Sequence, residues 1–205
     1  MSGETWEILQ NMEMEDVELQ MALQCAPVIT GIKISNLLSI QIQGYHRMID
    51  IVKDSGISVY TLGVAKDRVT IFLYHEDCLK HFLKQENVQA LMRTLGYGDE
   101  SLQEIIAAFR LRYQRYLQNR EWFPHEMGLL LGYPPEDVEG FIRYQGKNFL
   151  CTGYWKVYAN PIAKQQLFRR FEYAREQLVQ LLSIGMHMRE IMAIYSTRRE
   201  ACISG

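Results

Sequence analysis

The spacing of apolar residues changes near residue 75, and this change most constrains the fold. Before it lie two runs, 57–64 and 68–74, that are rich in β-branched and aromatic residues and are separated by Ala65-Lys66-Asp67. Such a pair predicts a β-hairpin. From Glu76 onward, apolar residues recur mainly at helical spacing. Because strands do not alternate regularly with helices, we expect an α+β fold and not a doubly wound sheet.

The whole pattern predicts a small, mainly antiparallel sheet of three or four strands, packed against about seven helices. Before the hairpin we expect a helix over 5–25 that Pro27 ends, a strand over 28–34, and a helix from Ser35 or Asn36 through Val52. After it we expect helices between 76 and 96 with a break near Glu86, a helix over 102–117, two short helices between 124 and 142, a strand over 149–158, and a long helix from Pro161 that reaches Tyr195 unless Gly185 breaks it.

The length and composition are those of an ordinary globular protein. The chain has 205 residues, of which 48% are hydrophobic and 22% charged, enough for one large domain or two small ones. Since no linker rich in proline, glycine or serine divides it, we expect a single domain over 1–205 with a tail that frays after about 196. The net charge of −2 provides no general attraction to nucleic acid or to an anionic membrane.

The cysteines indicate a reducing compartment. Four of them stand alone without a CxxC pair: Cys25, Cys78, Cys151 and Cys202. This spacing argues against a disulfide framework and against a zinc site. No apolar run approaches the roughly 20 residues that span a bilayer, and the N-terminus does not resemble a signal peptide. We therefore expect a cytoplasmic protein without membrane association or a metal site, and we assign no cofactor.

An adjacent histidine and glutamate, His125 and Glu126, are the candidate catalytic residues. Pro124 can occupy the first turn of a helix, and the positive end of a helix favours a neutral imidazole. A neutral His125 can act as a base or contact a ligand, and Glu126 can orient it or act as a second acid–base group. The alternative is a surface histidine beside a carboxylate that accepts backbone N–H groups. The absence of HExxH excludes a zincin-type site.

The predicted strand over 149–158 supplies the candidate ligand contacts. Alternation places Tyr154, Lys156 and Tyr158 on one face, and a lysine between two phenols suits an anionic or planar ligand. The alternative is that Lys156 extends between aromatic rings to reach solvent. Two further candidate contacts are Lys33, a lone cation in an apolar run, and Tyr133 in an LGYP turn. We expect the site where the His125 helix start meets this strand.

Two other functions remain open. The helix over 161–195 could pack against a second copy of the chain or another partner, with its methionine-rich end in the contact.

The helix over 110–120 resembles basic–aromatic RNA-binding surfaces. Its arginines, however, lie largely off the apolar face that its tyrosines share, which favours a solvated helix. The helix pair over 124–142 has spacing near that of a helix-turn-helix. Three acids in its second helix, Glu136, Asp137 and Glu139, argue against DNA, so nucleic-acid binding is the least favoured function.

Five motifs occur in order after residue 122: FPHE, LGYP, EDVEGFI, GK and GYWKVY. A chain with this series resembles the bacterial, clostridial-type family Domain of Unknown Function 3793. The resemblance covers roughly 25–175 and leaves out the acidic N-terminal segment and the methionine-rich tail. It implies a bacterial cytoplasmic protein, and it implies no particular activity.

Overall fold

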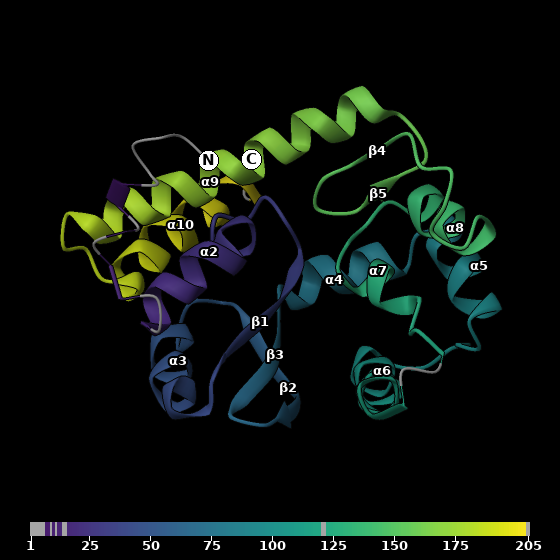
Figure 1. The fold of residues 1–205 in the computed structure, drawn as a ribbon, viewed down its shortest axis with the longest axis horizontal. Coiled ribbons are helices and arrows are strands. Elements are labelled where there is room, and N and C mark those ends of the chain that lie inside the picture. Colours follow the sequence, from purple (N-terminus) through teal and green to yellow (C-terminus); the bar gives the residue numbers. More distant parts are fainter. Residues whose placement is uncertain (1–6, 9, 11, 14–15, 120–121, 204–205) are drawn as a thin grey trace. The chain divides into compact units, whose positions relative to one another are not determined.

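The computed structural model describes residues 7–8, 10, 12–13, 16–119 and 122–203. The chain divides into two compact units (Figure 1). Unit 1 comprises Met1–His75 and Arg169–Gly205, and unit 2 comprises Glu76–Phe168. Helices together with small antiparallel sheets confirm the predicted α+β class. Two compact units can still belong to one domain, so the single domain expected over 1–205 stays a prediction.

Unit 1 contains a three-stranded antiparallel sheet in the order β1-β3-β2 (Figure 1). Its strands are β1 (Ser35–Gln41), β2 (Ser58–Ala65) and β3 (Arg68–Tyr74). The predicted hairpin is therefore confirmed as β2–β3. Strand β1 pairs with β3 along its whole length, from Ser35 opposite Tyr74 to Gln41 opposite Arg68. The alternating side chains of Val69, Ile71 and Leu73 enter the core of this unit.

The segment before the hairpin was predicted wrongly. Helix α2 (Val17–Ile29) contains Pro27 and continues two residues past it. No strand forms over 28–34, and the expected helix from Ser35 is strand β1 instead. Leu38 and Ile40 are buried while Ser39 between them is not, a period of two that pairing with β3 selects over the helical pattern. The predicted helix over 5–25 lies partly outside the described residues.

The remaining helices of unit 1 complete its core. The 3-10 turn η1 (Ile42–Gly44) leads into α3 (Tyr45–Val52). Helix α9 (Pro161–Ser183) begins in unit 2 and ends in unit 1, and α10 (Met188–Ile203) follows. The core unites buried residues of α2, the sheet, α3, α9 and α10, among them Leu19, Met21, Leu38, Met48, Ile71, Leu178 and Ile191.

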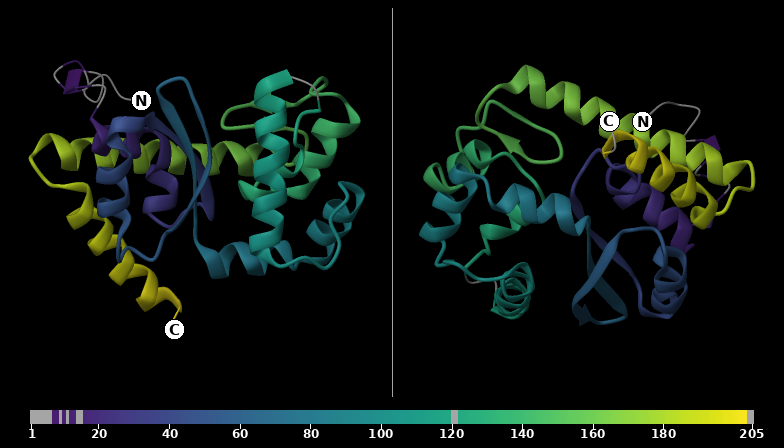
Figure 2. Two further views of the ribbon diagram at one scale, coloured as in Figure 1. Left: turned by 90° about the horizontal axis from the view of Figure 1, so that it is seen from below. Right: turned by 180° about the vertical axis from the view of Figure 1, so that it is seen from behind.

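The predicted C-terminal helix is divided at Gly185. This glycine has a φ of 90°, a conformation that suits glycine and ends helices. Figure 2 shows the chain turning here, so that α10 leads back from the end of α9. The long C-terminal helix is thus α9. The helical backbone of α10 continues to Ile203, past the point near 196 where we expected fraying.

Unit 2 is mostly helical. It contains α4 (Glu76–Leu83), α5 (Glu86–Thr94), α6 (Leu102–Asn119), α7 (Glu126–Leu130) and α8 (Pro135–Arg143). The predicted break near Glu86 and the end at Gly96, whose φ is 86°, are confirmed. Within the described residues, no helix is long and apolar enough to cross a membrane.

The predicted strand over 149–158 is wrong. The chain instead forms a tight hairpin of two short strands, β4 (Cys151–Thr152) and β5 (Lys156–Val157). Gly153 N–H donates to the Trp155 carbonyl at 3.1 Å, which closes the turn. A glycine at the centre of an otherwise strand-like run permits this reversal. Tyr154, Lys156 and Tyr158 therefore do not share one face of a strand.

Candidate ligand-binding pocket

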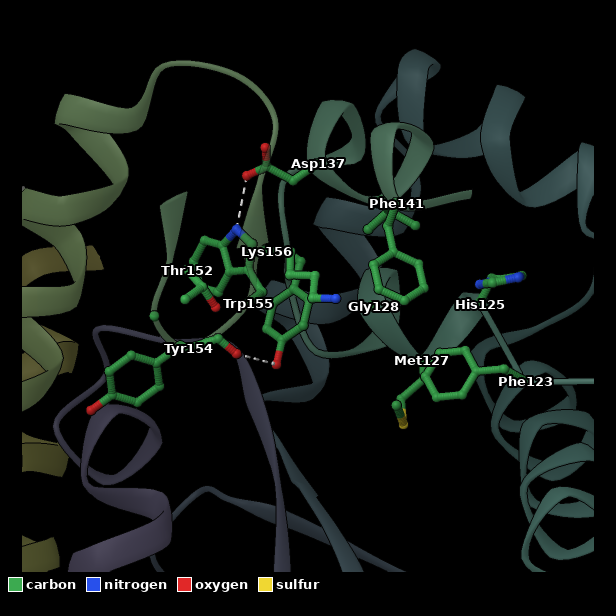
Figure 3. A pocket seen from close by; sticks show the side chains of 13 residues that line it. Phe123, His125, Met127, Gly128, Asp137, Phe141, Thr152, Tyr154, Trp155 and Lys156 are labelled. Atoms are coloured by element: carbon green, nitrogen blue, oxygen red, sulfur yellow. Dashed lines mark hydrogen bonds between the residues drawn. The ribbon is translucent and has the colours of Figure 1, made fainter. Parts of the chain in front are cut away.

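A cavity of about 310 Å³ lies within unit 2 (Figure 3). Three segments line it: the entry to α7 with α7 itself, α8 with its preceding turn, and the β4–β5 hairpin. Four of the predicted site residues are in the lining, namely His125, Tyr133, Tyr154 and Lys156. The volume lies at the lower end of the range for small-molecule sites, about 300–1,000 Å³. The cavity therefore suits a small ligand.

One wall is a stack of aromatic rings. The Tyr133 ring stacks on Trp155 with centroids 4.6 Å apart, and Phe168 meets Trp155 edge-on, also at 4.6 Å. The Tyr133 hydroxyl donates to the Tyr154 carbonyl at 3.5 Å. Burial raises the pKa of Tyr133 to about 12, so this phenol stays protonated. Figure 3 shows the Tyr154 ring directed away from the side of the cavity that holds His125.

The opposite wall is formed by Phe123, His125 and Phe141. The His125 ring centroid lies 5.4 Å from that of Phe123 and 5.9 Å from that of Phe141. The two phenylalanine centroids are 6.1 Å apart. Edge-to-face and tilted contacts of this kind stabilise a cluster by about 0.5–1.5 kcal/mol per pair. The cavity is thus enclosed by aromatic surface on two sides.

Asp137, near the start of α8, is an acceptor that is already engaged. Only 2% of it is exposed. One carboxylate oxygen accepts the Trp155 indole N–H at 2.8 Å. The other accepts the backbone N–H groups of Tyr158 at 2.7 Å and Ala159 at 3.1 Å. Asp137 therefore fastens the β4–β5 hairpin to α8 and has little capacity left to accept from a ligand.

Lys156 brings a positive charge to the cavity from β5. Its ammonium donates to the Gly146 carbonyl at 2.8 Å and lies 5.0 Å from the Phe149 ring centroid and 5.9 Å from that of Phe141. Among the described residues no carboxylate forms an ion pair with it. Figure 3 shows the ammonium directed toward Phe141 and Gly128. Two of its three N–H groups remain for a ligand.

The His125 imidazole lines the cavity from the opposite side. Its Nδ1 is buried and has no hydrogen-bond partner among the described residues. Burial lowers the pKa of His125, and the charge of Glu126 opposes this shift. The predicted neutral imidazole agrees with this direction, although burial rather than the helix end is its main cause. Because a buried N–H without an acceptor costs more than a bare lone pair, we assign the proton to Nε2.

Glu126 does not line the cavity. It is 2% exposed and accepts hydrogen bonds from the Tyr97 hydroxyl at 3.1 Å and from Arg112 at 3.4 Å. Arg112 also donates to the Leu95 carbonyl at 2.9 Å, and its guanidinium lies 4.6 Å from the Tyr97 ring centroid. These contacts join α6 and α7 to the end of α5. A second cavity of about 350 Å³ lies on this side, lined in part by Arg112, Arg115 and Trp122.

Two other predicted residues also lie outside the cavity lining. Lys33 belongs to unit 1, is 6% exposed, and donates to Asn36 at 2.5 Å. Burial lowers the pKa of Lys33 to about 8. The Tyr158 ring stacks on Tyr144 at 5.8 Å between centroids. Both residues thus have structural contacts of their own.

Several lining residues are not among the predicted site residues, chiefly Phe123, Met127, Asp137, Phe141 and Trp155. Asp137 had a signal, since an acid after two prolines is typical of the first turn of a helix. Its role in fastening the hairpin had no signal, because that role depends on a contact across 18 residues. Among the described residues, no group of three His, Cys, Asp or Glu side chains is placed to hold a metal ion.

The comparisons with known proteins give one match. A family model described as Protein of unknown function (DUF3793) matches residues 21–192. Neither a curated protein nor a solved structure matches the chain.

Proposed function

The chain belongs to the DUF3793 family of proteins of unknown function, and we propose that its unit 2 binds a small, planar, anionic molecule in the aromatic cavity. The observation that supports this most is the Lys156 ammonium. It is held by the Gly146 carbonyl among aromatic rings, without a carboxylate partner in the part of the chain that the structure describes. A cation in such a place attracts an anion, because low local polarity strengthens the interaction.

The hydrogen-bonding groups of the lining also favour an anionic ligand. The acceptor oxygens of Asp137 are used within the protein. Donors remain: two N–H groups of Lys156 and, in the assigned tautomer, Nε2–H of His125. A ligand with acceptor atoms therefore matches this lining, while a ligand with many donors would leave groups unpaired at a cost of about 1–3 kcal/mol each.

Binding has more support than catalysis. A histidine that acts as a base normally has its second nitrogen fixed by a carboxylate or carbonyl group. Nδ1 of His125 has no such partner among the described residues, and Glu126 is engaged by Tyr97 and Arg112. We therefore assign His125 to ligand binding and Glu126 to the structure of unit 2.

Native mass spectrometry of freshly purified protein tests the proposal. A panel of flat aromatic acids, phosphate esters included, is added to the wild type, to Lys156→Met, and to Lys147→Met as a matched control, since Lys147 is exposed and outside the cavity. We expect adducts with the wild type and the control, and about tenfold less with Lys156→Met, because a hydrogen bond to a charged group is lost. No adduct with any acid, or adducts that survive Lys156→Met unchanged, would contradict the proposal.

The two other functions have weaker support. On α6, Arg112 is engaged inside unit 2 while Arg110 and Arg115 are exposed, so the arginine helix offers fewer cations to nucleic acid than its sequence suggests. Binding that is absent at low salt in a salt titration would dismiss that function. On α9, Ile162 and Tyr173 are 73% and 64% exposed, and a concentration-dependent mass in solution would support self-association.

The proposal includes a bacterial, cytoplasmic location. Cys25, Cys78 and Cys151 are free thiols within the described part of the chain, as is usual for proteins of a reducing compartment. Fractionation of a native host, followed by detection of the protein, would test this expectation.

A further inference from the structure

We propose that the ligand of this cavity is an aromatic monocarboxylate. This inference rests on the proposed function and specifies its ligand class. It begins from the charges in the lining, where Lys156 is the only lysine or arginine and Asp137 the only acid. The two oxygens of Asp137 accept hydrogen bonds from three N–H groups, a pattern that is typical of an ionised carboxylate. The lining therefore has one positive charge against one negative charge.

This balance favours a ligand with one negative charge. A phosphate ester brings up to two charges and three acceptor oxygens, and proteins usually meet these with arginine forks or several backbone N–H groups. The arginines of the neighbouring part of unit 2, Arg112 and Arg115, line the second cavity and not this one. A second negative charge here would lose its hydration without a cation to replace it.

Two side chains of the lining carry donors that a carboxylate can use, the Lys156 ammonium and the His125 imidazole. Lys156 approaches from β5 and His125 from the start of α7 (Figure 3). Lys156 is already held by the Gly146 carbonyl at 2.8 Å, so little side-chain freedom is lost when an anion binds. The protein thus provides an ammonium that the Gly146 carbonyl holds in place, and the His125 imidazole is a further donor in the same lining.

The walls match a ring system. Phe123 and Phe141 are on one side, and Tyr133 with Trp155 is on the other. Offset and edge-to-face contacts with such rings favour a flat aromatic body over an aliphatic one. The volume of about 310 Å³ leaves room for one or two fused rings and a carboxylate, at the lower end of the range for small-molecule sites.

Three probes with one ring system separate the head groups: 2-naphthoate, 2-naphthamide and 2-naphthyl phosphate. Each is titrated into the 205-residue protein at neutral pH by calorimetry, and the Trp155 indole N–H resonance reports whether binding is in the cavity. We expect 2-naphthoate to bind at least about tenfold more tightly than the other two probes. The Trp155 resonance should shift with it.

Two variants assign this preference to Lys156. Lys156→Met should weaken 2-naphthoate by about tenfold and leave 2-naphthamide unchanged. Lys156→Arg keeps the cation and should keep 2-naphthoate within a few-fold, which guards against a loss that arises from misfolding. Lys147→Met should leave all three affinities unchanged.

The outcomes distinguish this inference from the proposed function. If 2-naphthyl phosphate binds as tightly as 2-naphthoate, shifts Trp155 and depends on Lys156, the carboxylate assignment is overturned while an anion site stands. If 2-naphthamide binds as tightly as 2-naphthoate, the anionic part of both proposals is overturned. If no probe shifts Trp155, both proposals are contradicted.

Discussion

At the scale of single residues, Lys156 and Asp137 differ in how many of their hydrogen-bonding groups remain for a ligand. Both line the same cavity and both are charged. The two carboxylate oxygens of Asp137 accept hydrogen bonds from the indole of Trp155 and from two backbone N–H groups. Lys156, in contrast, donates one N–H to the Gly146 carbonyl. A charged residue in a lining is therefore not by itself a ligand contact, and we separate a structural anion from a binding cation on this ground.

Replacing Asp137 should cost stability rather than affinity alone. Asp137→Asn puts an amide N–H₂ where an oxygen now accepts an N–H, so buried donors lose their partner, at about 2–4 kcal/mol of unfolding free energy. Urea denaturation measures this loss. Glu139→Gln on the same helix is the control, because Glu139 is exposed and pairs with Arg143 at the surface, and it should change stability by less than about 0.5 kcal/mol. Equal effects of the two substitutions would contradict the assigned role.

The burial of His125 predicts a pH dependence of stability. Burial lowers the pKa of His125 in the folded protein, so the unfolded chain binds this proton first as the pH falls. The stabilising contribution is complete above the ordinary histidine pKa of about 6.5 and is lost as the pH falls through that value toward the lowered one. Thermal unfolding of wild type and His125→Gln between pH 7.5 and 5 should show a smaller decline in the variant. Parallel declines would refute this.

At the scale of elements, the β4–β5 hairpin shows where sequence patterns reach their limit. The hairpin of unit 1 is predicted by two neighbouring runs rich in β-branched and aromatic residues that flank a short turn. The run 149–158 also alternates but reverses at Gly153, and Asp137 of another element holds the end of the hairpin by accepting the backbone N–H groups of Tyr158 and Ala159. The alternation of residues within one segment carries no information about a contact with another element. The sequence therefore predicts one long strand where two short ones form.

The close approach of this hairpin to Phe168 makes Gly153 sensitive to substitution. A Cβ added at Gly153 would lie 2.3 Å from Cδ2 of the Phe168 ring. We expect Gly153→Ala to displace that ring from Trp155 and to cost about 1–3 kcal/mol of unfolding free energy. Gly98→Ala is the matched control in the same unit, since the nearest atom to its added Cβ is 3.8 Å away. Denaturation curves and the near-ultraviolet signal of Trp155 measure both variants. An unchanged Trp155 signal in Gly153→Ala would contradict the expected packing.

At the scale of the whole molecule, the candidate site was partly predictable because its residues are close in sequence. His125, Tyr133, Tyr154 and Lys156 all fall within unit 2, so expecting them near one another required only short-range reasoning. Lys33 is a candidate only as a lone cation in an apolar run, and its place in unit 1 depends on contacts that a single sequence does not display. Glu126 is a candidate because it adjoins His125 in the sequence, yet the side chains of adjacent residues in a helix point in different directions.

The division into units leads to a prediction about an excised fragment. The lining of the cavity comes only from unit 2, as do the groups that support it, including Gly146, Phe149 and Phe168. A fragment of residues 76–168 should therefore fold alone, show a cooperative thermal transition by circular dichroism, and keep the Trp155 shift with 2-naphthoate. The same fragment with Asp137→Asn should melt at a lower temperature, because the hairpin loses its attachment to α8. A wild-type fragment with the spectrum of an unfolded chain would instead favour one domain over 1–205.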